Sequence, residues 1–362
     1  MKSIKRLKNL SNIKSPLLLT LFSLSTLLGS CKPTNVARFQ EIGKNNSANN
    51  SIGSSRSKKV IVLFHGLNRT GASEIAIIGQ YLSQDIKDSE IIILTRKNSC
   101  TVRMEDQVTD TYEQLEKVLA EKALLNSPIV LIGDSQGGVL AIKLYDTYKQ
   151  SLNIVGIITN HAPLEGTSAV NIPEQAIDKL DNILQTLLPW LSESLKLNIS
   201  NISFKKIFFK YFCGQGLIEL SLDSSFITNI KEILTNIQIP VLALGGTIEP
   251  LPGLIKLINF FSGLTISSES VETFIQLHVH NLPMSAIIIT EFNEEYAKIV
   301  GDKENDSLLP LYSQIGKNIR TNPTFFETFV VPGYHHFHGA REQPEVYNKI
   351  TAFINKCFSA KK

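Results

Sequence analysis

The 362-residue sequence has few cysteines, little charge and no internal repeat. None of its four cysteines stands in a C-x-x-C pair, which argues against a structural zinc site. Charged residues make up 19% of the chain and the net charge is only +3, so there is no electrostatic basis for nucleic acid as a partner. Hydrophobic residues make up 43%, which is ample for a sizeable core. The composition therefore indicates a globular protein.

The positive charge is concentrated at the N-terminus. Five basic residues and no acid occur in the first thirty, and an apolar run extends from Pro16 to Leu28. This run is shorter than the ~20 residues that a membrane-spanning helix needs. We therefore predict a cleaved export signal over residues 1–30, whose removal changes the net charge from +3 to −2.

The end of this leader, Leu28-Gly29-Ser30-Cys31, resembles the lipobox of bacterial lipoproteins. The resemblance implies that Cys31 is lipidated and anchors an exported protein to a membrane surface. Lys32 follows Cys31, which implies the outer membrane or the cell surface in bacteria that sort lipoproteins by this residue. Residues 31–57 are rich in Asn, Ser and Gly, and we predict that they form a flexible tether.

Three cysteines remain once Cys31 is assigned to lipid. They are Cys100, Cys213 and Cys357. In an oxidising compartment they allow one disulfide and one free thiol, and the sequence does not select the pair.

Residues 58–362 are predicted to form one α/β domain. Short apolar runs typical of buried parallel strands alternate with helical patterns, notably at 105–125 and 138–149. This alternation favours a mostly parallel sheet with helices on both faces. Two apolar segments of helical pattern, at about 169–235 and 251–300, interrupt it and are either extra core or a lid over an acyl pocket. The six runs begin at Val60, Ile91, Ile129, Ile154, Val241 and Phe325.

A G-x-S-x-G motif directly follows the apolar run that begins at Ile129. It reads G-D-S-Q-G over residues 133–137, and a helical pattern follows. A serine hydroxyl is a poor nucleophile, so an enzyme that uses one holds it on a sharp strand-to-helix turn beside a base and oxyanion donors. Gly133 and Gly137 allow such a turn, and Gly138 allows the helix to pack close to the sheet. Ser135 is therefore the predicted nucleophile.

The sequence resembles the α/β-hydrolase superfamily, and within it secreted bacterial lipases and related esterases. The resemblance rests on the motif at Ser135, on His-Gly-Leu at 65–67 and on H-A-P-L-E-G-T at 161–167, which is similar to the lipase stretch A-P-H-x-G-T. It implies the α/β-hydrolase fold and an oxyanion hole formed by the main-chain N–H groups of Leu67 and Gln136. His65 precedes the serine, where the superfamily does not place its base, so we interpret it as a loop-holding residue.

The base is expected after the last strand, where three histidines compete. The segment V-P-G-Y-H-H-F-H-G at 331–339 is similar to the hydrolase pattern P-G-x-x-H-F, which selects His336. An added residue before Gln343 keeps His338 as an alternative, and His335 is the third candidate. No carboxylate stands at a matching spacing for zinc, and His338 occupies the place of the calcium carboxylate of some lipases. We therefore predict no metal.

Two carboxylates are candidates for the acid that orients the base. Asp306 lies in E-N-D-S-L-L-P at 304–310, which resembles the N-D-G-L-V-P segment of lipases with Ser307 in place of glycine. Glu249 follows an apolar run, where many small hydrolases place their acid. We predict Asp306, because it precedes the last strand at a suitable distance and the lipase similarity continues beyond it.

These residues together predict a serine hydrolase that cleaves carboxylic esters of apolar or acyl-chain substrates. Ser135 attacks, His336 transfers the proton and Asp306 orients His336, with no cofactor. An acyltransferase or thioesterase would use the same triad. A non-catalytic surface lipoprotein on a hydrolase scaffold would require a broken triad, and this one is intact in the sequence.

Overall fold

A computed structural model describes residues 58–67, 74–96, 98–195, 203, 205, 214–262, 283–337, 340 and 343–359. The predicted export signal, the predicted lipidation site Cys31 and the predicted tether lie outside the described residues, as do Cys213 and His338. In the described part of the chain, no helix combines the length and the hydropathy required to cross a bilayer.

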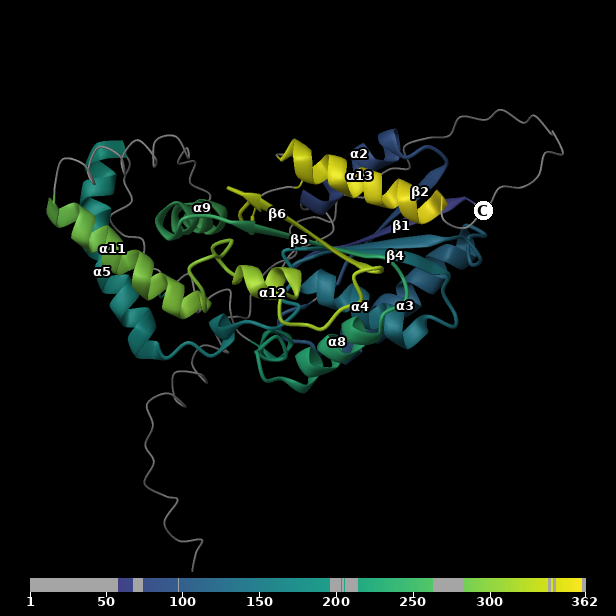
Figure 1. The fold of residues 1–362 in the computed structure, drawn as a ribbon, viewed down its shortest axis with the longest axis horizontal. Coiled ribbons are helices and arrows are strands. Elements are labelled where there is room, and N and C mark those ends of the chain that lie inside the picture. Colours follow the sequence, from purple (N-terminus) through teal and green to yellow (C-terminus); the bar gives the residue numbers. More distant parts are fainter. Residues whose placement is uncertain are drawn as a thin grey trace, which may run out of the picture. The chain divides into compact units, whose positions relative to one another are not determined.

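Six strands form a single parallel sheet (Figure 1), and each overlaps one of the predicted apolar runs, although β6 begins one residue after Phe325. Their spatial order is β2-β1-β3-β4-β5-β6. The predicted α/β-hydrolase fold is therefore confirmed. The strands are β1 (Lys59–Phe64), β2 (Ser89–Leu94), β3 (Ile129–Asp134), β4 (Ile154–Asn160), β5 (Val241–Thr247) and β6 (Phe326–Pro332).

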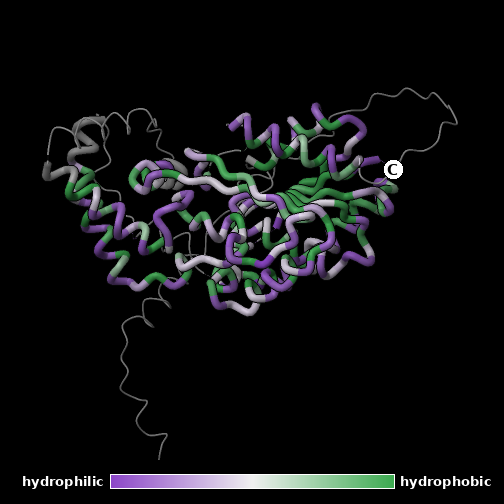
Figure 2. Tube along the Cα trace, in the orientation of Figure 1, coloured by the Kyte–Doolittle hydropathy of each residue, from purple (hydrophilic) through white to green (hydrophobic). Residues whose placement is uncertain are grey.

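Helices cover both faces of the sheet (Figure 1). Val60 and Val62 of β1 pack with α3 (Met104–Glu121), α4 (Gln136–Tyr148) and α8 (Ser225–Asn236). Ile61 and Leu63 point to the opposite face, toward α2 (Glu74–Asp85) and α13 (Pro344–Ser359). Strands buried on both faces need continuous apolar runs, and Figure 2 shows hydrophobic residues along the whole centre of the sheet.

Two of the cysteines lie on opposite faces of this sheet. Cys100 belongs to the cluster that contains α3, and Cys357 belongs to the cluster that contains α13. The sheet therefore separates them, and they do not pair with each other. Burial raises the pKa of the Cys357 thiol to about 12.

The segments that interrupt the strand–helix alternation are helical where the structure describes them. The first contains α5 (Glu174–Leu195) and α7 (Gln215–Ile218) in addition to α8, and the second contains α9 (Pro250–Ser262) and α11 (Pro283–Val300). α11 packs against α5 and α9 (Figure 1), and Lys179 of α5 pairs with Glu295 of α11 at 3.1 Å. A loop and the short α12 (Leu311–Ile315) then connect α11 to β6.

Candidate active site

Most of the candidate site lies at the carboxyl ends of the strands. Ser135 follows β3, His336 lies four residues beyond β6, and the segment 65–67 follows β1. Because all six strands are parallel, their carboxyl ends meet at one edge of the sheet, where ligands bind in open α/β folds. Asp306 comes from the loop between α11 and α12 instead.

The turn at Ser135 has the backbone of a strained elbow. Ser135 has φ 54° and ψ −124°, in a region that residues with a side chain rarely adopt. Its N–H donates to the main-chain oxygen of Asn160 at 2.8 Å, which ties the turn to the end of β4. A Cβ on Gly133 would overlap the main-chain oxygen of Gly137, and one on Gly138 would lie 2.5 Å from Cβ of Ala162. The motif therefore requires small residues at these positions, because neighbouring atoms approach the backbone too closely for a side chain.

Ser135, His336 and Asp306 form a continuous hydrogen-bonded path. Nε2 of His336 lies 2.9 Å from Oγ of Ser135, and Nδ1 lies 2.8 Å from Oδ2 of Asp306. The main-chain N–H of His336 also donates to the main-chain oxygen of Asp306 at 2.8 Å. The structure thus brings together the three residues predicted as nucleophile, base and acid, although 201 positions separate the serine from the histidine.

The carboxylate of Asp306 is fully buried and has several donors. Oδ1 accepts hydrogen bonds from the main-chain N–H groups of Leu308 and Leu309 at 3.0 and 2.7 Å. These donors favour the charged form, and the two histidines that face Oδ2 hold the pKa of Asp306 well below its usual range although burial opposes this shift. Ser307, where the similar lipase segment has glycine, has φ 79°, in the left-handed region that favours glycine.

The alternative residues lie elsewhere. Glu249 is exposed between β5 and α9, and among the described residues its carboxylate contacts no histidine. His335 is buried, and its Nδ1 accepts a hydrogen bond from the N–H of Phe337 at 3.2 Å. His338 lies outside the described residues and is not placed.

The two predicted oxyanion donors come from segments on either side of the serine. A Cβ on Gly66 would lie 3.0 Å from Cβ of Ser135, so the segment that carries Leu67 borders the predicted nucleophile. Gln136 begins α4 directly after it. The ring of His65 accepts from the N–H of Arg96 through Nε2 at 2.9 Å, and Nδ1 lies 2.8 Å from the oxygen of Gly66. These contacts hold the loop, as the interpretation of His65 expects.

Arg96, which the sequence analysis did not single out, connects these two segments. Its guanidinium donates to the main-chain oxygen of His65 and, through Nη1, to Oε1 of Gln136 and of Gln107 at 3.1 and 2.9 Å. Arg96 is 3% exposed and forms no ion pair with a carboxylate in the described part of the chain. Because the cation is buried without a counter-charge, its pKa is lowered to about 9. No sequence motif marks this residue, which lies two positions after β2.

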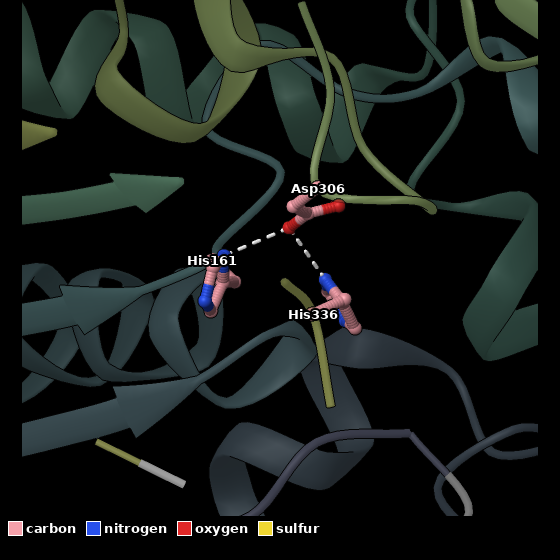
Figure 3. Close-up of side chains that lie close together, drawn as sticks. All are labelled: His161, Asp306 and His336. Atoms are coloured by element: carbon pink, nitrogen blue, oxygen red, sulfur yellow. Dashed lines mark hydrogen bonds and ion pairs between the residues drawn. The ribbon is translucent and has the colours of Figure 1, made fainter. Parts of the chain in front are cut away.

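His161 is the second residue that the sequence analysis did not assign a role, although it begins the H-A-P-L-E-G-T stretch. Its Nδ1 lies 2.8 Å from Oδ2 of Asp306, the same oxygen that faces His336 (Figure 3). Ligand atoms of His161, Asp306 and His336 lie within 4.8 Å of one another, a spacing that a metal ion could bridge. Both Nδ1 atoms face a carboxylate oxygen at hydrogen-bond distance, so protons rather than a metal account for the geometry.

The sheet order and the elbow after β3 give the chain the α/β-hydrolase fold. Residues 60–210 match the sequence model of the palmitoyl protein thioesterase family. This match covers less than half of the chain and includes the elbow, but neither Asp306 nor His336. No curated protein shows significant similarity to the sequence.

The fold is similar to several solved structures of low sequence identity. Phospholipase PlaB from Legionella pneumophila, in complex with thio-NAD, is 13% identical over 83% of this chain and 62% of its own, with a TM-score of 0.49. A lipase from Bacillus licheniformis is 13% identical over 84% of this chain and 96% of its own, with a TM-score of 0.44. A monoacylglycerol lipase from Paleococcus ferrophilus is 12% identical over 83% of this chain and 96% of its own, with a TM-score of 0.45. The chain spans less than two thirds of the length of the phospholipase.

Proposed function

We propose that the chain is a serine hydrolase that cleaves carboxylic esters or thioesters of apolar acyl chains. The observation that carries this proposal is the path from Oγ of Ser135 through the ring of His336 to Oδ2 of Asp306, with contacts of 2.9 and 2.8 Å. A nucleophile, a base and an orienting acid in this geometry are the parts that acyl transfer to serine needs.

In the proposed reaction, Oγ of Ser135 attacks the carbonyl carbon while Nε2 of His336 takes the hydroxyl proton. The imidazolium then gives this proton to the departing alcohol or thiol, and the acyl group stays on Ser135. A water molecule attacks the acyl-serine with His336 again as base, and return of the proton to Oγ releases the carboxylic acid. Asp306 stays ionised throughout, because the donors around it favour its charged form, and it stabilises the imidazolium.

The main-chain N–H groups of Leu67 and Gln136 are the proposed donors to the oxyanion. Negative charge develops on the carbonyl oxygen in the transition state, so donors that are already fixed in place stabilise it without reorganisation. Arg96 fixes both segments and adds a positive charge that no carboxylate of the described residues neutralises. Its burial strengthens the effect of that charge, because less water screens it.

Apolar helices beside the acid loop support an acyl chain as part of the substrate. α5 carries the fully buried Leu184 and Leu187 and packs against α11. The hydroxyl of Tyr296 in α11 donates to the main-chain oxygen of Ser307, next to the proposed acid. We therefore propose that these helices border an acyl pocket. Residues 207–212, which belong to the predicted lid-like segment 169–235 and are also apolar, lie outside the described residues.

A series of p-nitrophenyl esters of increasing chain length tests the proposal. Ser135→Ala should abolish hydrolysis and labelling by a fluorophosphonate, because loss of the nucleophile costs orders of magnitude in rate. Ser83→Ala on the exposed side of α2 is the matched control and should retain both. For the wild type, kcat/KM should be higher for medium or long acyl chains than for acetate. Full activity of Ser135→Ala would overturn the hydrolase proposal, and a steady decline with every methylene would overturn the acyl pocket.

The thioester form of the reaction has its own support, since residues 60–210 match the palmitoyl protein thioesterase family. Palmitoyl-CoA should be hydrolysed, and this activity, measured through the free thiol that it releases, should depend on Ser135 in the same way. If palmitoyl-CoA is not cleaved while long-chain p-nitrophenyl esters are, the substrate class is restricted to oxygen esters. Transfer of the acyl group to an added alcohol would instead identify an acyltransferase.

We also propose that the protein is an exported lipoprotein held at a membrane surface, in the outer membrane or at the cell surface, through acyl chains on Cys31. The support for this is the sequence Leu28-Gly29-Ser30-Cys31 after a basic and then apolar leader. Such an anchor would hold the hydrolase domain close to lipid substrates.

A further inference from the structure

We propose that His161 is a positioning residue that sets, through Asp306, the pH at which His336 acts as the base. This inference rests on the proposed function, because it concerns the same triad. It arises from two imidazole rings that face one carboxylate oxygen (Figure 3). A Ser-His-Asp triad requires only one of these rings.

The side-chain amide of Gln314 shows which ring nitrogen of His161 carries the hydrogen. Nδ1 of His161 lies 3.1 Å from Oε1 of Gln314 and 2.8 Å from Oδ2 of Asp306. The amide of Gln314 is oriented by Gly246, whose N–H donates to Oε1 at 2.8 Å, and by Leu309, whose oxygen accepts from Nε2 at 2.9 Å. Both neighbours of Nδ1 are therefore acceptors. Nδ1 must carry the hydrogen, which the two acceptors share.

The Nε2 atom and the backbone of His161 are both in energetically unfavourable states. His161 is fully buried, and its Nε2 has no hydrogen-bond partner among the residues that the structure describes. Its φ of 48° lies in the left-handed region. An unpaired buried nitrogen and a left-handed backbone each cost free energy, so only the surrounding structure keeps this ring beside Asp306. The ring also packs on Tyr334, with 4.3 Å between ring centroids.

A donor at Oδ2 weakens the field that Asp306 exerts on His336. The N–H of His161 withdraws negative charge from the oxygen that would stabilise the imidazolium of His336, so it favours the neutral ring that can accept the serine proton. The titratable groups that face this carboxylate are His161 after β4, His336 after β6 and Tyr296 of α11. In the described part of the chain no lysine or arginine pairs with Asp306, so the two rings dominate its surroundings.

The test is the pH profile of kcat/KM for a p-nitrophenyl ester in two His161 variants. His161→Phe keeps the ring volume and removes the donor, so the acidic limb should move to higher pH by about half to one unit. His161→Asn is the matched control, because its amide N–H can replace Nδ1–H and asparagine tolerates positive φ. The limb of His161→Asn should stay at the wild-type pH. Both variants lose stability if the site is only structural, and the melting temperature reports that loss separately.

Gln314→Met gives an independent variant with the opposite sign. It removes the competing acceptor, so the His161 hydrogen should bond Asp306 alone and the acidic limb should move to lower pH. This variant decides the question if His161→Phe does not fold. An unmoved limb in His161→Phe, or equal shifts in His161→Phe and His161→Asn, overturns the role of His161. Hydrolysis that persists in Ser135→Ala overturns the proposed function instead, so the two failures are distinguishable.

Discussion

Nη1 of Arg96 lies 3.1 Å from Oε1 of Gln136, the residue that follows the proposed nucleophile. The side chain of Gln136 is held on its other side as well, since Nε2 donates to the main-chain oxygens of Ser99 and Gly216 at 2.9 and 3.2 Å. The same guanidinium binds the main-chain oxygen of His65. One buried cation thus links the two segments that carry the proposed oxyanion donors.

Arg96→Met should lower kcat by about 10- to 100-fold and leave KM nearly unchanged. The substitution removes the positive charge and the hydrogen bonds that fix the two oxyanion segments, and both act mainly on the transition state. Arg96→Lys keeps the charge but not the planar fork and should fall between Met and the wild type. Arg103→Met, in an exposed arginine that precedes α3, is the control and should keep wild-type kinetics. Wild-type kcat in a folded Arg96→Met protein would contradict the proposed role of Arg96.

Asp306→Asn should lower kcat by about 10³- to 10⁴-fold, because an amide cannot stabilise the imidazolium of His336 and permits the wrong tautomer. Glu249→Gln should keep wild-type activity, since Glu249 is exposed and contacts none of the described histidines. Steady-state kinetics on one ester decide between them. The reverse result, a silent Asp306→Asn and an inactive Glu249→Gln, would move the acid to Glu249.

The folded protein should lose stability in acid partly through Asp306. Its pKa is lower in the folded than in the unfolded chain, so its contribution is present above the unfolded pKa of about 3.9 and is lost as the pH falls toward the folded pKa. Urea unfolding at pH 7, 5 and 3 should therefore give a flatter pH dependence for Asp306→Asn than for the wild type. Glu249→Gln should follow the wild type. Parallel curves for wild type and Asp306→Asn would refute the coupling.

The wild-type protein expressed in a bacterium should fractionate with membranes and carry acyl mass on an N-terminal Cys31. Cys31→Ala should lack that mass, because no other residue can accept the lipid in the same way. Cell fractionation and mass spectrometry of the N-terminus measure both properties. A soluble wild type without acyl mass, or a Cys31→Ala protein anchored like the wild type, would show that the lipoprotein proposal is wrong. Hydrolysis by a shortened protein that begins near Ser57 should survive either result.

Much of the fold could be predicted from short stretches of sequence. The run Val60 to Phe64 is apolar at every position, as a strand buried on both faces requires. The runs that begin at Ile91, Ile129 and Val241 share this property, whereas the run of the edge strand β6 includes the polar Glu327 and Thr328. Ser135 could be predicted for the same local reason: the turn that exposes it needs small residues at fixed offsets. For Asp306 and His336 the prediction rests on resemblance to lipase segments, and the sequence alone leaves Glu249, His335 and His338 as alternatives.

The sequence by itself determined the elements, their order and the strand-to-helix turn that carries the proposed nucleophile, because hydrophobic period and turn chemistry act between neighbours in the chain. Only the tertiary structure decided which carboxylate meets His336, since that contact joins a loop after α11 to a loop after β6. It also decided the contacts on which the proposed roles of Arg96 and His161 rest. Neither residue belongs to a local pattern that marks its function, and each acts through partners that only the parallel sheet brings to one edge.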